Sequence, residues 1–280
     1  MSGFTQRALT AVVFVVVMLG GLFGGKYSFS LLFLLITALC LWEFWSLCLD
    51  AEEGNKNGWS QIFGLFLGLL PISLVAIERV SLLPQAEILL QKGFLLLPAL
   101  FFLLFVYELT QGAVKPFRNL AYLALGLLYI SLPFALLVYL AIDGNGHYSP
   151  LLVLGMLLLT WANDTGAYLV GSKLGKTPLF PRISPNKTWE GSMGGVFIGL
   201  LVGWGLSFIV PTYSTFEWLV IALIIVIFGS LGDLVESMLK RSLKIKDSGH
   251  FLPGHGGFLD RFDAFIFVIP FVAAFLLCFR

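Results

Sequence analysis

Acidic residues interrupt or adjoin the most apolar stretches in the C-terminal half of this chain. Asp164 lies inside one apolar run, while Asp233 with Glu236, and later Asp260 with Asp263, are spaced so that each pair shares one helix face. An ionisable side chain at the centre of a membrane helix costs roughly 2.5–3.5 kcal/mol, so such residues often mark a site. Carboxylates that converge from several helices repel one another unless a cation lies among them. Because no Cys or His set accompanies these oxygen ligands, the pattern predicts a hard cation, Mg²⁺ before zinc.

Basic residues and glycines surround these carboxylates in two polar segments. The cations are Lys173, Lys176, Arg182 and Lys187 in the first segment, and Lys240, Arg241, Lys244, Lys246 and Arg261 in or beside the second. The second also contains GHGG, from Gly254 to Gly257, whose backbone N–H groups can turn toward an anion such as phosphate. A divalent cation, basic side chains and such a turn are what phosphoryl transfer requires, because its catalysis is mostly positioning and charge neutralisation.

A simpler interpretation stays open for each of these residues taken singly. A carboxylate can cap a helix end or pair with Lys240, Arg241 or Arg261 where the chain meets the membrane surface. The basic residues also follow from the preference of cytoplasmic loops for Lys and Arg, and from contact with anionic lipid. His250 and His255 could bind a metal, but beside Gly and Pro they can equally be structural. The convergence of several carboxylates is what favours a site.

The GSKLGKT stretch, from Gly171 to Thr177, resembles a phosphate-binding P-loop without satisfying its pattern. The glycine required at position 170 is Val170, and the stretch follows a membrane helix and not a strand. We therefore interpret it as a basic loop.

The elements that must position these residues are membrane helices. Of the 280 residues, 58% are hydrophobic and only 12% are charged, well beyond the apolar share of soluble domains. Since a membrane helix needs roughly 20 mostly apolar residues, we expect an all-α integral membrane protein, a polytopic bundle of about nine transmembrane helices, with eight or ten as alternatives. The predicted spans are 8–25, 29–49, 59–77, 93–110, 119–142, 150–171, 192–211, 217–237 and 261–279.

The distribution of positive charge predicts the orientation of the chain. Of the 17 Lys and Arg residues, all but four fall on the side of the N-terminus, the exceptions being Lys26, Arg79, Lys92 and Arg280. Because cytoplasmic loops carry an excess of these residues, we expect a cytoplasmic N-terminus and two cytoplasmic polar loops.

The two polar loops, 172–191 and 238–260, also suggest how the chain is organised, since both lie in its second half. We expect residues 1–142 to form N-terminal transmembrane helices for scaffolding or oligomerisation, and residues 143–280 to form the catalytic transmembrane region.

The stretch from Ser237 to Asp263, SMLKRSLKIKDSGHFLPGHGGFLDRFD, closely resembles the signature of the CDP-diacylglycerol synthases, also called phosphatidate cytidylyltransferases. It matches S-x-L-K-R, four residues, K-D-x-G, two residues, L-P-x-H-G-G, two residues, D-R-x-D throughout. The upstream stretches WANDTGAYLVGSKLGK, RISPNKTWEG and GSLGDLVES are similar to family motifs and occur in the family's order. The resemblance covers about the C-terminal half of the chain.

This resemblance implies an Mg²⁺-dependent nucleotidyltransferase that transfers CMP from CTP to phosphatidate, giving CDP-diacylglycerol and pyrophosphate in phospholipid biosynthesis. It also implies a monovalent cation, K⁺, and a homodimer, with membrane lipid and not nucleic acid as a partner. One substrate is water-soluble and the other carries its phosphate at the headgroup plane. A site at the cytoplasmic face of the cell (inner) membrane would give both substrates access.

Carried over residue by residue, the resemblance assigns Asp233 and Asp260 as metal ligands, with Asp263 either a further ligand or a partner that orients Arg261. The residues expected to take part in catalysis are Asp233, Asp260, Lys246 and Arg261. Those expected to bind substrate are Lys173, Ser184, Asn186, Lys187, Lys240, Arg241, His255, Gly256 and Gly257. Asp164 is a further candidate, structural or linked to the metal.

Three rival functions use the same residues differently. A transporter for an anionic solute would also place Asp in apolar spans, but it favours matching interrupted spans in both halves, and here the polar interruptions are nearly all C-terminal. A phosphotransferase of the CDP-alcohol class would carry D-G-x-x-A-R, which is absent from the sequence. A structural scaffold would have no use for so costly a cluster of charges.

Overall fold

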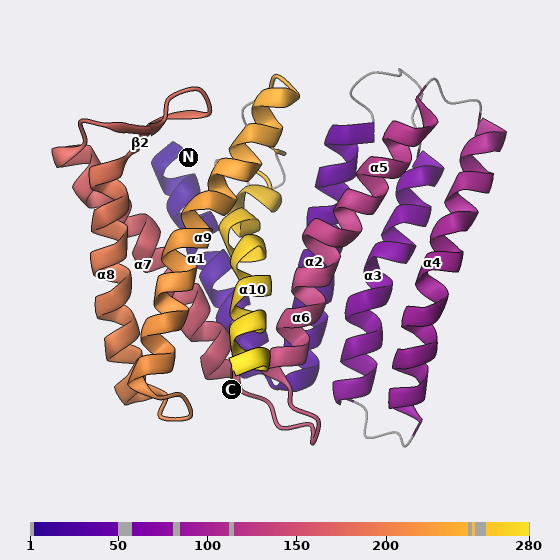
Figure 1. Ribbon diagram of the computed structural model, residues 1–280, viewed down its shortest axis with the longest axis horizontal. Coiled ribbons are helices and arrows are strands. Elements are labelled where there is room, and N and C mark those ends of the chain that lie inside the picture. Colours follow the sequence, from indigo (N-terminus) through magenta and orange to yellow (C-terminus); the bar gives the residue numbers. More distant parts are fainter. Residues whose placement is uncertain are drawn as a thin grey trace. The chain divides into compact units, whose positions relative to one another are not determined.

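The structure is a computed structural model that describes residues 3–49, 58–80, 85–111, 115–245, 248–249 and 256–279. Figure 1 shows that helices make up nearly all of it. The elements in chain order are α1 (Gly3–Phe23), α2 (Lys26–Leu49), α3 (Gly58–Val80), α4 (Ala86–Gln111), α5 (Pro116–Gly126), η1 (Leu127–Ser131), α6 (Leu132–Ala141), α7 (Pro150–Leu174), β1 (Pro178–Phe180), β2 (Ser184–Thr188), α8 (Trp189–Ile209), α9 (Thr215–Ser242) and α10 (Leu259–Phe279).

Each of the nine predicted spans coincides with a helical segment when α5, η1 and α6 are counted as one run. The expected all-α polytopic architecture is therefore confirmed. Within the described residues, seven segments are long and apolar enough to cross a membrane: α2, α3, α4, α5 to α6, α8, α9 and α10. The described apolar part of α1, Leu9–Phe23, is shorter, and Asn163 and Asp164 lower the hydropathy of α7.

The two polar loops contain more regular structure than the sequence suggests. Helix α9 continues to Ser242, so Lys240 and Arg241 lie in its last turn and not in a loop. Much of the first polar segment forms an antiparallel hairpin of β1 and β2, with Phe180 paired to Ser184. Prediction by hydropathy ends a helix where the sequence turns polar, but an amphipathic last turn can continue into water.

The chain divides into two compact units. The first consists of Met1–Tyr148 with Asp247–Asp260, and the second of Ser149–Lys246 with Arg261–Arg280. The first unit thus includes residues 247–260, which belong to the signature motif near the end of the chain. The functional division expected from the sequence, 1–142 as scaffold and 143–280 as catalytic region, stays a prediction.

Aromatic side chains fill the core of the first unit. The rings of Phe29 and Phe33 lie 4.9 Å apart on α2, and Phe33 lies 5.7 Å from Phe134 of α6. Trp45 is fully buried, and its indole N–H donates to the Tyr122 carbonyl oxygen at 3.1 Å. The polar edge of a buried Trp requires such a partner. These contacts join α2 to the α5–α6 run.

Glycines allow α7 and α8 of the second unit to approach each other closely. A Cβ on Gly166 of α7 would lie 2.9 Å from the Gly194 carbonyl oxygen, and a Cβ on Gly191 would lie 2.9 Å from the Ala167 carbonyl oxygen. Small residues at a helix interface permit this approach in membranes, where close van der Waals packing supplies much of the attraction. The hairpin ends directly before α8, so this packing also fixes the position of that end of the hairpin.

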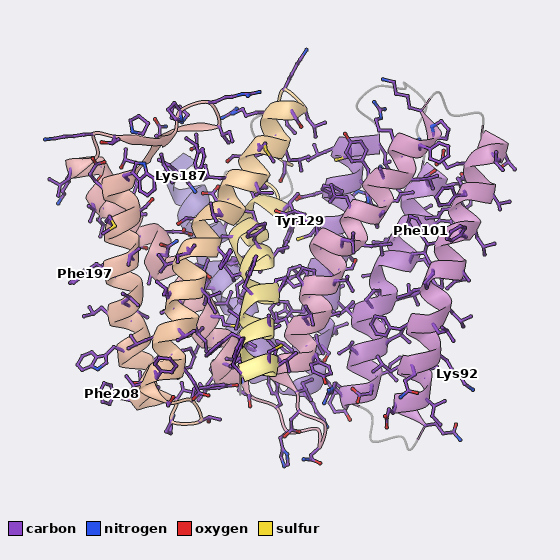
Figure 2. The ribbon with its side chains drawn as sticks, in the orientation of Figure 1. Lys92, Phe101, Tyr129, Lys187, Phe197 and Phe208 are labelled. Carbon is purple, nitrogen blue, oxygen red and sulfur yellow. The ribbon has the colours of Figure 1, made fainter. Side chains whose placement is uncertain are left out.

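Large apolar side chains cover the outer surface of both units, as expected for helices in lipid. Figure 2 shows Phe197 and Phe208 projecting outward from α8, where their side chains are 68% and 69% exposed. Lys92 projects from α4 close to one of its ends (Figure 2). A lipid solvent removes the reason to bury such apolar surface.

We predict that Gly194→Val destabilises the α7–α8 packing, because the new side chain would meet Val170 and the Gly166 carbonyl oxygen. Overpacking of this kind costs about 1–3 kcal/mol, so the thermal unfolding midpoint in detergent should fall. The matched control is Gly205→Val on the same helix, where nothing lies within 4 Å of an added Cβ. Equal midpoints for the two variants would contradict the prediction.

Candidate functional site

Three carboxylates from two helices meet in the second unit. Asp233 and Glu236 of α9 and Asp263 of α10 each offer an oxygen, and these oxygens lie within 4.8 Å of one another. Glu236 is fully buried and Asp263 is 9% exposed. Asp233 and Asp263 are brought together as the sequence predicts. Glu236 was recognised as a costly acidic residue, but it received no role.

The sequence around Gly232 explains how the two helices come so close. A Cβ on Gly232 would lie 2.5 Å from Phe267 Cβ and 3.2 Å from Ala264 Cα, so only glycine allows α10 to pack at this point. The stacked rings of Phe228 and Phe271, 3.6 Å apart, hold the same pair of helices together nearby. Asp233 directly follows Gly232, and Asp263 directly precedes Ala264. The close approach of the two helices at this point therefore brings the two carboxylates near each other.

Two lysines neutralise part of the charge of this acidic cluster. Lys187, on strand β2, forms an ion pair with Asp233 and approaches the Ser230 carbonyl oxygen at 3.5 Å. Lys240, one turn after Glu236 on α9, pairs with Glu236. Figure 2 labels Lys187 beside the hairpin. Three carboxylates and two ammonium groups leave a net negative charge, which favours a further cation.

A cavity of about 720 Å³ opens next to this cluster, within the second unit. Its wall is formed by residues of α7, the hairpin, α8 and α9: Asn163, Asp164, Ala167, Tyr168, Gly171, Ser172, Gly175, Lys176, Pro178, Pro185, Asn186, Lys187, Thr188, Gly191, Ser192, Ser230 and Asp233. A volume of this size suits a nucleotide-sized ligand. Acidic, basic, amide and hydroxyl side chains line this wall together with glycines and prolines, so it can bind a polar ligand.

Glu190 holds the basic stretch at the mouth of this cavity. Its Oε2 accepts hydrogen bonds from the backbone N–H groups of Lys176 and Thr177, both at 3.1 Å, and its Oε1 accepts from Thr177 Oγ1 at 2.9 Å. In a P-loop these amides would face phosphate. Here they face a protein carboxylate, in agreement with the interpretation of GSKLGKT as a basic loop.

The remaining residues predicted to bind substrate in the second unit are placed unequally. Asn186 and Lys187 form part of the cavity wall, whereas Lys173 and Ser184 are not among its wall residues in the described chain. Arg241 is exposed on the last turn of α9, and its Nη1 lies 3.5 Å from the Ile245 carbonyl oxygen. Arg261 is exposed near the start of α10.

Asp260 belongs to the first unit, together with the glycines of the signature motif. Its Oδ2 accepts hydrogen bonds from the backbone N–H groups of Ser248 at 3.0 Å and Gly257 at 2.9 Å. Gly256 has a φ of +83°, a conformation that suits glycine. The Asp260 carboxylate therefore joins the backbone of Ser248 to that of Gly257. The predicted residues Lys246 and His255, and also His250, lie outside the described residues.

Several wall residues escaped sequence reasoning. Thr188 and Ser192 lie at the start of α8, where Thr188 caps the helix by accepting a hydrogen bond from the Gly191 N–H at 3.1 Å. Ser230 accepts one from Asn163 at 3.4 Å. Hydroxyl residues at a helix end carry no chemical signal in the sequence beyond the capping pattern itself. Their place in the wall depends on α7, α8 and α9 meeting around the cavity.

Comparison with known proteins relates the chain to one family. A model of the "Cytidylyltransferase family" matches residues 5–279. A protein of Bacillus subtilis (strain 168) named phosphatidate cytidylyltransferase is 34% identical over 268 residues, which cover 95% of each chain. Proteins of the same name from Staphylococcus aureus (strain COL) and Staphylococcus haemolyticus (strain JCSC1435) are 33% and 35% identical, covering 94% of this chain and 95% of theirs.

The match runs through the acidic cluster of α9 and α10, the hairpin and the N-terminal helices alike, so it concerns the whole molecule and not one motif. This chain belongs to the cytidylyltransferase family.

Proposed function

We propose that this protein is a CTP:phosphatidate cytidylyltransferase, which transfers CMP from CTP to phosphatidate and releases pyrophosphate. The observation that carries the proposal is the acidic cluster of Asp233, Glu236 and Asp263 beside a cavity of about 720 Å³, in a chain whose relatives of that name match along 95% of its length. Clustered carboxylates next to a cavity large enough for a nucleotide suit the transfer of an anionic group between two anionic substrates.

In this reaction a phosphate oxygen of phosphatidate forms a bond to the α-phosphorus of CTP. The bond between the α-phosphorus and the oxygen that bridges to the β-phosphate breaks, and pyrophosphate leaves with that electron pair. The attacking phosphate is already largely ionised near neutral pH, because its second pKa lies near 6. No side chain is therefore assigned as a general base.

The donor set fits a divalent cation. Asp233, Glu236 and Asp263 supply only carboxylate oxygens, which hard ions such as Mg²⁺ prefer, and their oxygens lie within 4.8 Å of one another. We propose that Asp233 and Asp263 hold Mg²⁺, with Glu236 completing the acidic cluster. The metal-binding role of Asp260 rests on the family motif alone. Bound Mg²⁺ would neutralise phosphate charge during transfer. A monovalent cation, K⁺, remains part of the proposal on the resemblance alone.

Lys187 is the basic residue with the strongest support for substrate binding. It lies in the cavity wall and pairs with Asp233, so its ammonium group can exchange between a carboxylate and a substrate phosphate. Asn186 lies beside it in the wall and offers an amide to the nucleotide. Lys240, Arg241, Lys246 and Arg261, with Gly256 and Gly257, keep the phosphate-binding roles that the family motif assigns. The roles of Lys173, Ser184 and His255 rest on the same motif.

We also propose where the protein acts. Seven segments of the described residues are long and apolar enough to cross a membrane, which supports a multi-pass membrane protein. The excess of Lys and Arg on the side of the N-terminus supports a cytoplasmic site in the cell membrane, which CTP can reach from solution and phosphatidate from the bilayer. The expected homodimer is retained from the family resemblance.

We predict that the detergent-purified protein releases pyrophosphate only when CTP, phosphatidate and a divalent cation are all present. Leaving out each component in turn should abolish release, because both substrates and the charge-neutralising ion enter the same transfer step. Coupled detection of pyrophosphate and chromatography of the lipid product provide the measurement. A folded preparation that releases none with several phosphatidates would contradict the proposed activity.

We predict that Asp263→Asn lowers kcat by about 100-fold or more and weakens binding of Mn²⁺, used as a paramagnetic probe for the Mg²⁺ site. The loss follows because the variant removes one charged ligand from the acidic cluster, and ligand geometry sets the stabilisation of phosphoryl charge. The matched control is Asp143→Asn, since Asp143 lies in the turn between α6 and α7 and binds the backbone of Asn145 and His147. Unchanged Mn²⁺ affinity in Asp263→Asn would exclude Asp263 as a ligand.

We predict that Lys187→Met raises the KM for CTP about tenfold or more, because a charge-assisted contact to phosphate is lost. The comparison variant is Lys92→Met, which removes an exposed lysine from α4 in the other unit. Initial rates at varied CTP concentration check the effect. If Lys187→Met kept the wild-type KM, the ammonium group would not contact the nucleotide.

A further inference from the structure

A buried glutamate of the second helix contacts the signature motif from the far end of the sequence. Glu43 lies in α2 and is 6% exposed. Its Oε2 accepts a hydrogen bond from the backbone N–H of Leu259 at 2.9 Å, across 216 positions of the chain. Leu259 is the first residue of α10, where backbone N–H groups have no partner within the helix and favour a negative charge. Glu43 therefore supplies an acceptor that α10 cannot provide for itself.

The glycines of the motif are shaped around this carboxylate. A Cβ on Gly249 would lie 2.7 Å from Glu43 Oε1, and a Cβ on Gly257 would lie 2.5 Å from Glu43 Oε2. Gly249 and Gly257 also face each other, since the same Cβ on Gly249 would lie 3.4 Å from Gly257 Cα. The Glu43 carboxylate thus lies between two backbone segments of the motif, at a distance that only glycine permits.

Asp260, which belongs to the motif itself, also joins these two backbone segments. Its Oδ2 joins the N–H groups of Ser248 and Gly257, while Glu43 binds the neighbouring N–H of Leu259. Two carboxylates therefore fix three consecutive parts of the motif: Ser248–Gly249, Gly256–Gly257 and Leu259–Asp260. All of these residues belong to the first unit, so the contacts are internal to it.

Stability alone does not explain a charged residue here. Among the described residues, Glu43 Oε1 and Ser248 Oγ are both buried without a hydrogen-bond partner. A buried polar atom without a partner is costly, and an apolar side chain in α2 would avoid that cost. Such atoms in a native structure call for an explanation. Within the part of the chain that the structure describes, a smaller or apolar residue at position 43 would lose the contacts of the carboxylate to the motif.

We propose that Glu43 is a positioning residue for cytidylyl transfer, which holds the glycine-rich turn and the start of α10 in the arrangement that the reaction requires. The proposal rests on the proposed function, in which the motif binds substrate phosphate and metal. It gives a helix of the N-terminal half a part in the reaction without direct contact to the reacting atoms.

The test compares Glu43→Leu and Glu43→Gln with the same changes at Glu108. Glu108 is the matched control because it is also a buried carboxylate of the first unit, 3% exposed, but it accepts a hydrogen bond from Ser60. Glu43→Leu removes the acceptor for the Leu259 N–H, whereas Glu43→Gln keeps an amide oxygen at the same place. Pyrophosphate release and amide hydrogen exchange are measured on the full-length protein in detergent.

We expect Glu43→Leu to lower kcat about 10- to 100-fold, a loss typical of a misplaced reacting geometry. Glu43→Gln should keep kcat within about fivefold of wild type, because the acceptor is restored, and Glu108→Leu should stay within about threefold. Exchange in the peptide that covers residues 248–260 should increase in Glu43→Leu and not in Glu108→Leu. Wild-type kcat in Glu43→Leu, or equal losses in both Leu variants, would overturn the proposal.

A second variant covers the case in which Glu43→Leu does not fold. Gly249→Ala pushes a methyl group against Glu43 Oε1, whereas Gly20→Ala adds one where nothing lies within 4 Å. Only Gly249→Ala should lower kcat and increase exchange in the 248–260 peptide, and full activity in this variant would overturn the proposal. If the wild-type protein released no pyrophosphate, the proposed function would fail, and the exchange measurement by itself would decide whether Glu43 holds the motif.

Discussion

Negative charge held between apolar helices is the constraint on which the second unit depends. Asp233, Glu236 and Asp263 share a small volume on α9 and α10, and nearby cations lower the repulsion between them. Lys240 lies one turn after Glu236 on the same helix, so formation of this helix is enough to bring the two side chains together. Lys187 comes from β2, so the hairpin must fold back over α9 to deliver it. The hairpin and the acidic cluster are therefore joined by this ion pair, and residues of both line the cavity.

Glycine decides how closely the elements that carry these charges can approach. Gly232 lets α10 pack against α9, and Gly166, Gly191 and Gly194 let α7 pack against α8. In lipid, helix association depends on close packing more than on burial from water, so a single Cβ at such a position separates the helices. The same rule applies in the first unit, where Gly249 and Gly257 make room for the Glu43 carboxylate. Glycines in this chain thus bring charges together as much as they form turns.

The first unit also holds residues of the signature motif. The described residues 248–249 and 256–260 of the signature motif belong to the same unit as the N-terminal helices, and Glu43 of α2 accepts a hydrogen bond from Leu259. An aromatic core of Phe29, Phe33 and Phe134, all fully buried, holds α2 against α6 and gives Glu43 a rigid base. Rigid elements place functional side chains more precisely than loops do. Under our proposal, α2 does more than support the fold, because it carries Glu43.

The sequence by itself determined the membrane class, the positions of the helical segments and the family, because apolar runs and motif spacing are local properties of the chain. It also marked Asp233 and Asp263 as costly acidic residues and predicted that they bind a metal. Only the tertiary structure decided that Glu236 joins them, that Lys187 pairs with Asp233, and that Glu43 binds Leu259 across 216 positions. The physical reason is that these contacts depend on how whole helices pack. Glycine and aromatic residues far from the charges set that packing. No local pattern in the sequence shows which distant partner a buried carboxylate will meet.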